Sequence, residues 1–177
     1  MEASTPERRS RLRQYQVQLL ERMQAAKSGP ATGGRELGVV IGGRHCLLDL
    51  TQISEIVPLQ ALTPVPLTQP WYLGLANIRG QLTGVVALDS YLHGQPPAPV
   101  SSGQRDITLA PQLKLHCALR VEAVLGLRYL AEMVEQEALA AAPAWCSQQF
   151  DDADGQRWHR LDLARLVREP GFLHVGL

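Results

Sequence analysis

The most unusual polar feature of the sequence is an Asn-Ile-Arg-Gly segment at positions 77–80, which interrupts two strongly apolar runs. Asn77 and Gly80 suit a tight turn, because asparagine tolerates left-handed backbone geometry and glycine adopts it freely. A turn gives no reason for Arg79, whose planar guanidinium carries N–H donors that match a carboxylate or carbonyl oxygens. The segment therefore allows two interpretations, a plain turn or a turn that presents an arginine to a partner.

Groups that could catalyse a reaction or hold a metal do not converge in the sequence. The five histidines lack the i, i+4 spacing of a zinc-binding helix. No hydrolase elbow, P-loop or glycine-rich dinucleotide motif is present, and the three cysteines form no C-x-x-C pair. Cys46 and Cys117 lie in apolar runs, where a thiol behaves as a small core residue. We therefore expect no enzymatic activity, no cofactor and no metal site.

An acidic stretch near the C-terminus superficially resembles a calcium-binding loop. Asp151, Asp152 and Asp154 cluster as in such a loop, but the twelfth position from Asp151 is Asp162, where these loops carry glutamate, and the ninth is His159. Asp-Gly at positions 154–155 is instead a strong signal for a tight β-hairpin turn. The stretch is therefore predicted to be a solvated hairpin between two short strands.

Composition limits the class of protein. The chain has 177 residues, of which 45% are apolar, with 17 basic and 17 acidic side chains, as in a globular protein with a core of its own. A nucleic-acid-binding protein normally carries a basic excess. Six bases fall within residues 1–27 and six acids within residues 132–154, which gives either two solvated surfaces or two docking faces. No stretch resembles a signal peptide or a membrane span, so we expect a cytoplasmic protein without membrane insertion.

The first segment has the pattern of a helix. Thr5 can cap it, Pro6 suits the first helical position, and apolar residues recur at helical spacing from Leu12 to Met23. Its apolar stripe would pack on the chain's own domain or, alternatively, on a partner or a membrane surface. Residues 28–34 read as a flexible linker, so residues 1–34 form an N-terminal extension.

The rest of the chain has the pattern of short strands. Gly-Gly at 42–43 predicts a hairpin, prolines exclude a regular ladder from residues 58–70, and a second helix is expected at 162–167, ended by Pro170. Residues 94–103, rich in proline, serine and glycine, form the clearest internal boundary. We therefore predict a mainly β protein of two small barrels, at 35–93 and 104–177, with strand exchange between them.

Two motifs in this order resemble those of the CheW-like family of chemotaxis adaptors. The first joins Ile-Ser-Glu-Ile-Val at 53–57 to Gly-Leu-Ala-Asn-Ile-Arg-Gly at 74–80, and the second is Leu-Arg-Val-Glu-Ala-Val-Leu-Gly at 119–126. Trp71, the N-terminal extension and the ending at 170–173 are most similar to the adaptors of type IV pilus twitching motility. An adaptor of flagellar chemotaxis is the alternative. A nucleic-acid-binding β-barrel is a weaker one, because only nine aromatic residues are present.

The resemblance implies two intertwined SH3-like barrels of five strands each and no catalysis. It implies two partners, the cytoplasmic tip of a methyl-accepting chemoreceptor and the regulatory domain of a CheA-type histidine kinase, at receptor arrays on the inner membrane. The partner-binding residues that it implies fall in three places along the chain: Ile53, Glu55 and Ile56; Asn77, Arg79 and Gly80; and Val121. Relatives usually carry proline and aspartate where this chain has Gly84 and Ala87.

Overall fold

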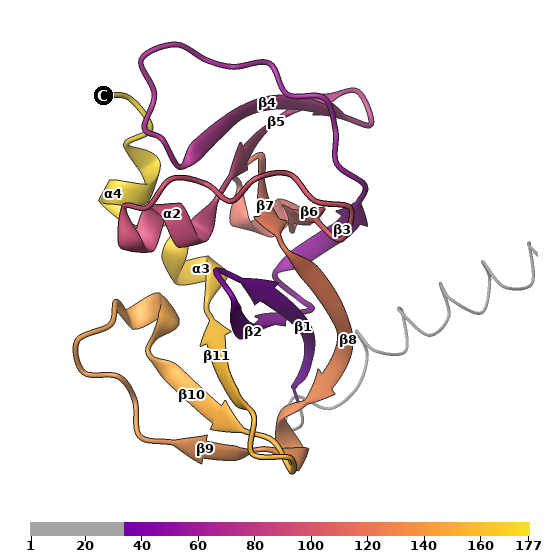
Figure 1. The fold of residues 1–177 in the computed structure, drawn as a ribbon, viewed down its shortest axis with the longest axis vertical. Coiled ribbons are helices and arrows are strands. Elements are labelled where there is room, and N and C mark those ends of the chain that lie inside the picture. The colour runs from indigo at the N-terminus through magenta and orange to yellow at the C-terminus, as the bar shows by residue number, and fades with distance from the viewer. Residues whose placement is uncertain (1–33) are drawn as a thin grey trace, which may run out of the picture. The chain divides into compact units, whose positions relative to one another are not determined.

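The computed structural model describes residues 34–177, so the predicted N-terminal helix and its linker up to residue 33 lie outside the described residues. Within that part the chain is mainly β, as the sequence predicts (Figure 1). The strands form two sheets that share one core.

The first sheet, called sheet A, has six strands in the order β8-β1-β2-β11-β10-β9. Their bounds are β1 (Arg35–Ile41), β2 (Arg44–Asp49), β8 (Ala123–Tyr129), β9 (Val134–Gln136), β10 (Gln148–Asp151) and β11 (Arg157–Leu161). The two turns predicted from Gly-Gly and Asp-Gly are confirmed, since they connect β1 to β2 and β10 to β11.

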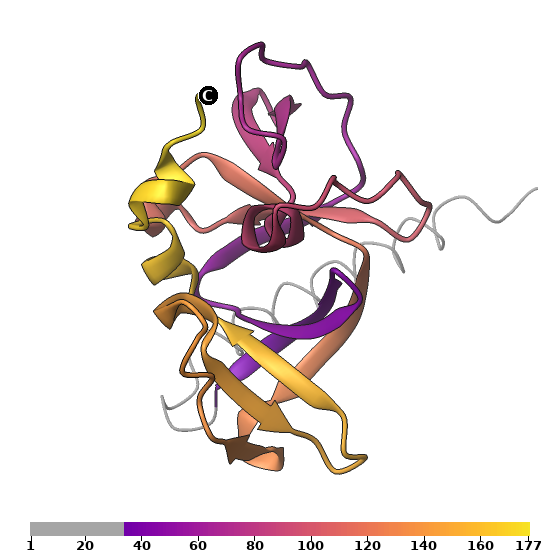
Figure 2. The same cartoon turned by 60° about the vertical axis from the view of Figure 1, so that its left-hand side comes forward.

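The second sheet, called sheet B, has five strands in the order β3-β6-β7-β5-β4. Their bounds are β3 (Ile53–Val57), β4 (Tyr72–Ile78), β5 (Gln81–Val86), β6 (Arg105–Leu109) and β7 (Cys117–Val121). The β4–β5 hairpin projects at the end of the described unit opposite to the β10–β11 hairpin (Figures 1 and 2). The turns of these two hairpins therefore lie far apart.

Neither sheet closes into the five-stranded barrel that was expected. Sheet A runs from β8 to β9 and sheet B from β3 to β4, and these end strands share no ladder. Each sheet instead contains one parallel pair, β2 with β11 and β5 with β7, which joins strands far apart in sequence. Both sheets draw strands from either side of residues 94–103, and the division of the chain into subdomains at that linker stays a prediction.

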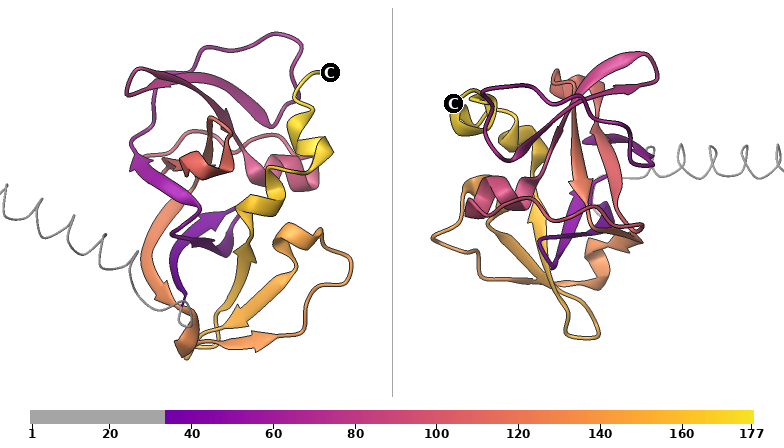
Figure 3. Two further views of the ribbon diagram at one scale, coloured as in Figure 1. Left: turned by 180° about the vertical axis from the view of Figure 1, so that it is seen from behind. Right: turned by 45° about the horizontal axis from the view of Figure 1, so that its top comes forward.

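Short helices close the ends of the sheets. They are α2 (Leu88–His93), α3 (Leu163–Leu166) and α4 (Pro170–Leu173), with 3-10 turns η1 (Pro111–Leu113), η2 (Leu130–Glu132) and η3 (Ala144–Cys146). The helix predicted at 162–167 is α3, and Asp162 caps it by accepting a hydrogen bond from the Arg165 N–H. Pro170 does not end this helix but begins α4, because proline fits the first helical position, where its missing N–H has no partner. The two helices follow each other along one side of the unit (Figure 3).

The main core lies between the sheets and is anchored by aromatic rings. Trp71 stacks on Phe172 with ring centres 5.6 Å apart, and Tyr91 meets both rings edge-on. Cys46 and Cys117 are buried as predicted, and burial raises the pKa of both thiols to about 12, so they stay protonated at neutral pH. The core therefore fixes the C-terminal helix α4 against the start of β4.

A single residue separates the two sheets between β7 and β8. This residue is Glu122, whose N–H donates to the Val40 carbonyl at 2.8 Å. Its carboxylate accepts from the Gly43 N–H at 3.2 Å, within the β1–β2 turn. One extended segment thus passes from sheet B into sheet A. Both the backbone N–H and the side chain of Glu122 bond to the β1–β2 hairpin there.

Candidate functional site

The tip of the β4–β5 hairpin is a two-residue turn. Arg79 and Gly80 have φ values of 51° and 82°, and Ile78 pairs with Gln81 across the ladder. Two successive positive φ values are the requirement of a type I′ turn, whose twist matches that of the flanking strands. The Asn77 side chain accepts a hydrogen bond from the Gly80 N–H at 2.8 Å, which fixes the turn from one side. The segment 77–80 is therefore the turn that its sequence predicts.

Arg79 occupies the position in this turn that suits it least. Type I′ turns strongly favour asparagine, aspartate or glycine at this position. An L-residue with a longer side chain pays about 1–2 kcal/mol for the left-handed conformation. The side chain nevertheless points into solvent, with 77% of its surface exposed. Within the described part of the chain, burial of the Arg79 side chain therefore does not offset the unfavourable backbone conformation.

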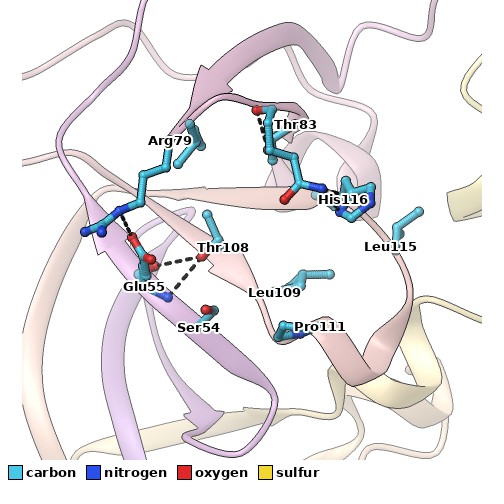
Figure 4. A pocket seen from close by; sticks show the side chains of 12 residues that line it. Ser54, Glu55, Arg79, Thr83, Thr108, Leu109, Pro111, Leu115 and His116 are labelled. Atoms are coloured by element: carbon cyan, nitrogen blue, oxygen red, sulfur yellow. Dashed lines mark hydrogen bonds and ion pairs between the residues drawn. The ribbon is translucent and has the colours of Figure 1, made fainter.

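Glu55 faces Arg79 from β3, the edge strand at the other end of the order of sheet B. Nε of Arg79 lies 2.7 Å from Oε2 of Glu55, and the carboxylate side chain is 34% exposed (Figure 4). The Nε–H is not aligned with Oε2 as a hydrogen bond requires, so the contact is one of charge. Within residues 34–177 the guanidinium donates no aligned hydrogen bond. The arginine is held near the surface and keeps its donors available.

A shallow groove runs beside this ion pair. Its volume is about 330 Å³, and it lies between β3, the β4–β5 hairpin and η1. Its polar lining includes Ser54, Thr83, Thr108 and His116, while Leu109 and Leu115 supply apolar surface (Figure 4). Such a surface can hold an apolar side chain and several neutral hydrogen-bonding groups of another protein.

Two large apolar side chains are exposed on the same strands. Ile56 on β3 is 45% exposed and Leu82 on β5 is 67% exposed. Exposed aliphatic residues on the strands that carry an exposed ion pair are a combination of apolar and charged groups that protein interfaces use. We call the surface made by Glu55, Ile56, Asn77, Arg79, Gly80 and Leu82 the docking face.

The predicted site residues divide into an exposed and a buried group. Arg79 meets Glu55 and Asn77 bonds to Gly80 at the hairpin tip, and Ile56 is exposed next to Glu55 in β3, whereas Ile53 and Val121 are buried in the main core at 8% and 1% exposure. The latter two side chains support sheet B from beneath and do not line its surface. Sequence reasoning misses Leu82 and Thr108, since an exposed leucine and a strand threonine are common in any sheet.

The two departures from the family pattern have different surroundings. A Cβ atom on Gly84 would lie 2.8 Å from the Tyr72 hydroxyl, so the tyrosine ring occupies the space that a side chain at 84 would need. Burial raises the pKa of this tyrosine. Ala87 precedes α2 and gives that helix no side-chain cap. The packing of Tyr72 thus explains why residue 84 is glycine. Nothing in the structure explains alanine at position 87.

The acidic β10–β11 turn is arranged very differently. Asp152 accepts hydrogen bonds from the Trp158 indole at 2.9 Å and from the N–H groups of Asp154 and Gln156, and these bonds lower its pKa. Asp151 pairs with Arg157, which lowers the pKa of that carboxyl as well. The carboxylates of Asp151 and Asp152 are engaged in holding the hairpin, as a solvated structural turn requires.

None of the helices in residues 34–177 combines the length and apolar character needed to cross a bilayer.

Comparison with known proteins identifies the family. The profile of the CheW-like domain matches residues 36–171, which include both sheets and the docking face. Protein PilI of Pseudomonas aeruginosa is 26% identical over 144 residues, covering 80% of this chain and 79% of PilI. The scaffolding protein TtCheW of Thermoanaerobacter tengcongensis superposes with a TM-score of 0.64 at 18% identity, over 79% of this chain and 96% of that one. The resemblance seen in the sequence is confirmed, and the chain belongs to the CheW-like domain family of scaffolding proteins.

Proposed function

We propose that this chain is a non-enzymatic adaptor that couples a methyl-accepting chemoreceptor to a CheA-type histidine kinase. Membership of the CheW-like family supports the class of function, and the similarity to PilI favours type IV pilus signalling and twitching motility over flagellar chemotaxis. An adaptor with these partners works in the cytoplasm, beneath receptor arrays at the inner membrane. Its task is to bind both partners and to favour one of their relative arrangements, which is a coupling of free energies without a chemical step.

One observation carries the proposal, namely Arg79 at the tip of the hairpin. The residue is kept in a left-handed position that asparagine or glycine would fill at lower cost, and most of its side chain is exposed. An unfavourable local conformation at an exposed residue is a reason to look for a function there. Arg79 can offer a fork of donors to a carboxylate or to carbonyl oxygens of a partner.

The surroundings of Arg79 supply the remaining parts of an interface. Ile56 and Leu82 give exposed apolar area on β3 and β5, and the groove next to Glu55 and Arg79 gives neutral polar contacts. A few anchors of this kind contribute most of the free energy of a protein interface, and the surrounding contacts exclude water. We assign the docking face to one of the two partners, with Arg79 as its central anchor.

The test is the substitution Arg79→Ala in the full chain. We expect at least a tenfold loss of affinity for the receptor tip or the kinase regulatory domain, which corresponds to about 1.4 kcal/mol. Isothermal titration with each purified partner measures the effect, and circular dichroism checks the fold. Arg165→Ala is a matched control, because Arg165 is also exposed and paired with a carboxylate, but lies on α3.

A folded Arg79→Ala protein that binds both partners as the wild type does would refute the assignment. Purification of the adaptor from its native cells, with identification of the bound kinase and receptor, distinguishes a pilus system from a flagellar one.

A further inference from the structure

Strand β3 contains a β-bulge next to Glu55. Ile53 pairs with Leu109 and Ile56 pairs with Ile107, so Ser54 and Glu55 together face the single residue Thr108 on β6. A bulge leaves backbone groups of the longer strand without their ladder partners. Unpaired N–H and C=O groups at a partly buried position are costly, so something must replace the missing bonds.

The hydroxyl of Thr108 takes the place of these ladder bonds. Its Oγ1 accepts a hydrogen bond from the Glu55 N–H at 3.0 Å, and it donates to the Glu55 carbonyl oxygen at 3.4 Å. Both bonds go to the same residue of the bulge. Figure 4 shows Thr108 beside Glu55, on the side of the groove. The threonine side chain therefore fixes the backbone of Glu55 where the sheet does not.

The direction of the Glu55 side chain depends on this bulge. Side chains alternate between the two faces of a strand, so loss of the extra residue would move every following side chain to the other face. With the bulge in place, the carboxylate reaches Nε of Arg79. Since this contact has no aligned hydrogen bond of its own, its geometry is set by the two backbones, through Thr108 on one side and Asn77 on the other.

We propose that Thr108 is a positioning residue for the docking face. It orients Glu55, and Glu55 orients the guanidinium of Arg79 so that its outer edge meets a carboxylate or carbonyl group of the partner. This inference rests on the proposed function, because it assigns a role in the same binding event.

The experiment compares three substitutions in the full chain. Thr108→Val removes the hydroxyl at nearly constant shape, and Thr108→Ser retains it. Thr68→Val is the matched control, because the Thr68 hydroxyl also donates to a backbone carbonyl, that of Val65 at 2.9 Å, but Thr68 does not line the groove. Affinity for the partner that senses Arg79→Ala is measured by titration for each protein, and also for Thr108→Val combined with Arg79→Ala.

We expect Thr108→Val to weaken binding about three- to tenfold, the range that corresponds to one hydrogen bond. Thr108→Ser and Thr68→Val should bind as the wild type does, and Thr108→Val should have no further effect once Arg79 is replaced. Hydrogen exchange of the Glu55 amide supplies a second measurement, with protection in the wild type and in Thr108→Ser and fast exchange in Thr108→Val.

Three results would overturn the inference: unchanged binding by Thr108→Val with an exposed Glu55 amide, equal losses for Thr108→Val and Thr68→Val, or full additivity with Arg79→Ala. Failure of the proposed function is a separate result, since Arg79→Ala would then have no effect on either partner.

Discussion

The two hairpins at opposite ends of the described unit use their polar groups in opposite ways. In the β10–β11 turn, Asp152 is bonded to two backbone N–H groups and to the indole of Trp158, which is buried beneath it. In the β4–β5 turn, Asn77 alone secures the backbone, and Arg79 keeps its donors toward solvent. One hairpin is completed by its own side chains, and the other is left with groups that another molecule can complete.

This difference shows how a turn built for stability can be told from a turn that carries function. Aspartate and glycine are the residues that tight turns favour on physical grounds, and β10–β11 contains them. The β4–β5 turn has glycine at its second position but arginine at its first, against the local preference. At this exposed position, Arg79 adopts a backbone conformation that its residue type disfavours, which is consistent with the partner binding proposed for this hairpin.

The largest expected effect comes from removing the packing beneath the structural hairpin. Trp158→Ala should lower the free energy of unfolding by about 3–5 kcal/mol, as for other large-to-small changes in a core. Trp158 packs with Leu47 and Phe150 on the outer side of sheet A. Urea unfolding measures the loss. Binding to the partner of the docking face, measured where the variant is still folded, should stay as in the wild type; a loss of binding there would show that the hairpins are not separate in function.

A smaller effect is expected from Asp152→Asn in the same turn. Hydrogen bonds lower the pKa of Asp152 below its ordinary value of 3.8, so its stabilising effect is present above that pH and is lost as pH falls through the lowered pKa. The variant should melt a few degrees below the wild type at pH 7, and the two curves should converge in strong acid. Thermal melts across this pH range test the point, and a gap that stays constant down to the lowest pH would contradict it.

The smallest effect on stability, and one of opposite sign, is expected at the other turn. Arg79→Asn relieves the left-handed strain and should stabilise the fold by up to about 1 kcal/mol. The exposed ion pair with Glu55 contributes only about 0–1 kcal/mol in return. Melting temperature and partner affinity are measured on the same sample, with Arg79→Ala for comparison. A variant that is both less stable and fully able to bind would remove the contrast between the hairpins.

Several elements of the fold depend on short-range sequence patterns, and the sequence predicts these elements correctly. Gly-Gly at 42–43 and Asp-Gly at 154–155 locate two hairpins, because only a few residues adopt the conformations that tight turns need. The open sheets of six and five strands were not predicted, since the parallel pairs β2–β11 and β5–β7 join distant segments and leave no mark in turn chemistry. Pro170 was read as a stop, although the same residue is also a good start for the next helix.

The candidate site was predicted in part for a similar reason. The family resemblance brought Glu55 and Arg79 to attention, but it did not indicate that they meet across two strands. Their contact requires a bulge in β3, and a bulge depends on the register with β6, which one strand alone does not encode. Val121 looked like a site residue within its motif, yet an apolar residue in the central strand β7 belongs to the core.

The passage through Glu122 has a mechanical consequence. Strands β7 and β8 form one continuous extended segment that crosses from one sheet to the other. The bonds from Glu122 to the β1–β2 hairpin restrain rotation of this segment. A force applied at the docking face of sheet B is then transmitted to sheet A, because no flexible linker separates the two strands. In the adaptor function proposed above, this connection would make the orientation of a partner on one sheet depend on the binding of a partner on the other.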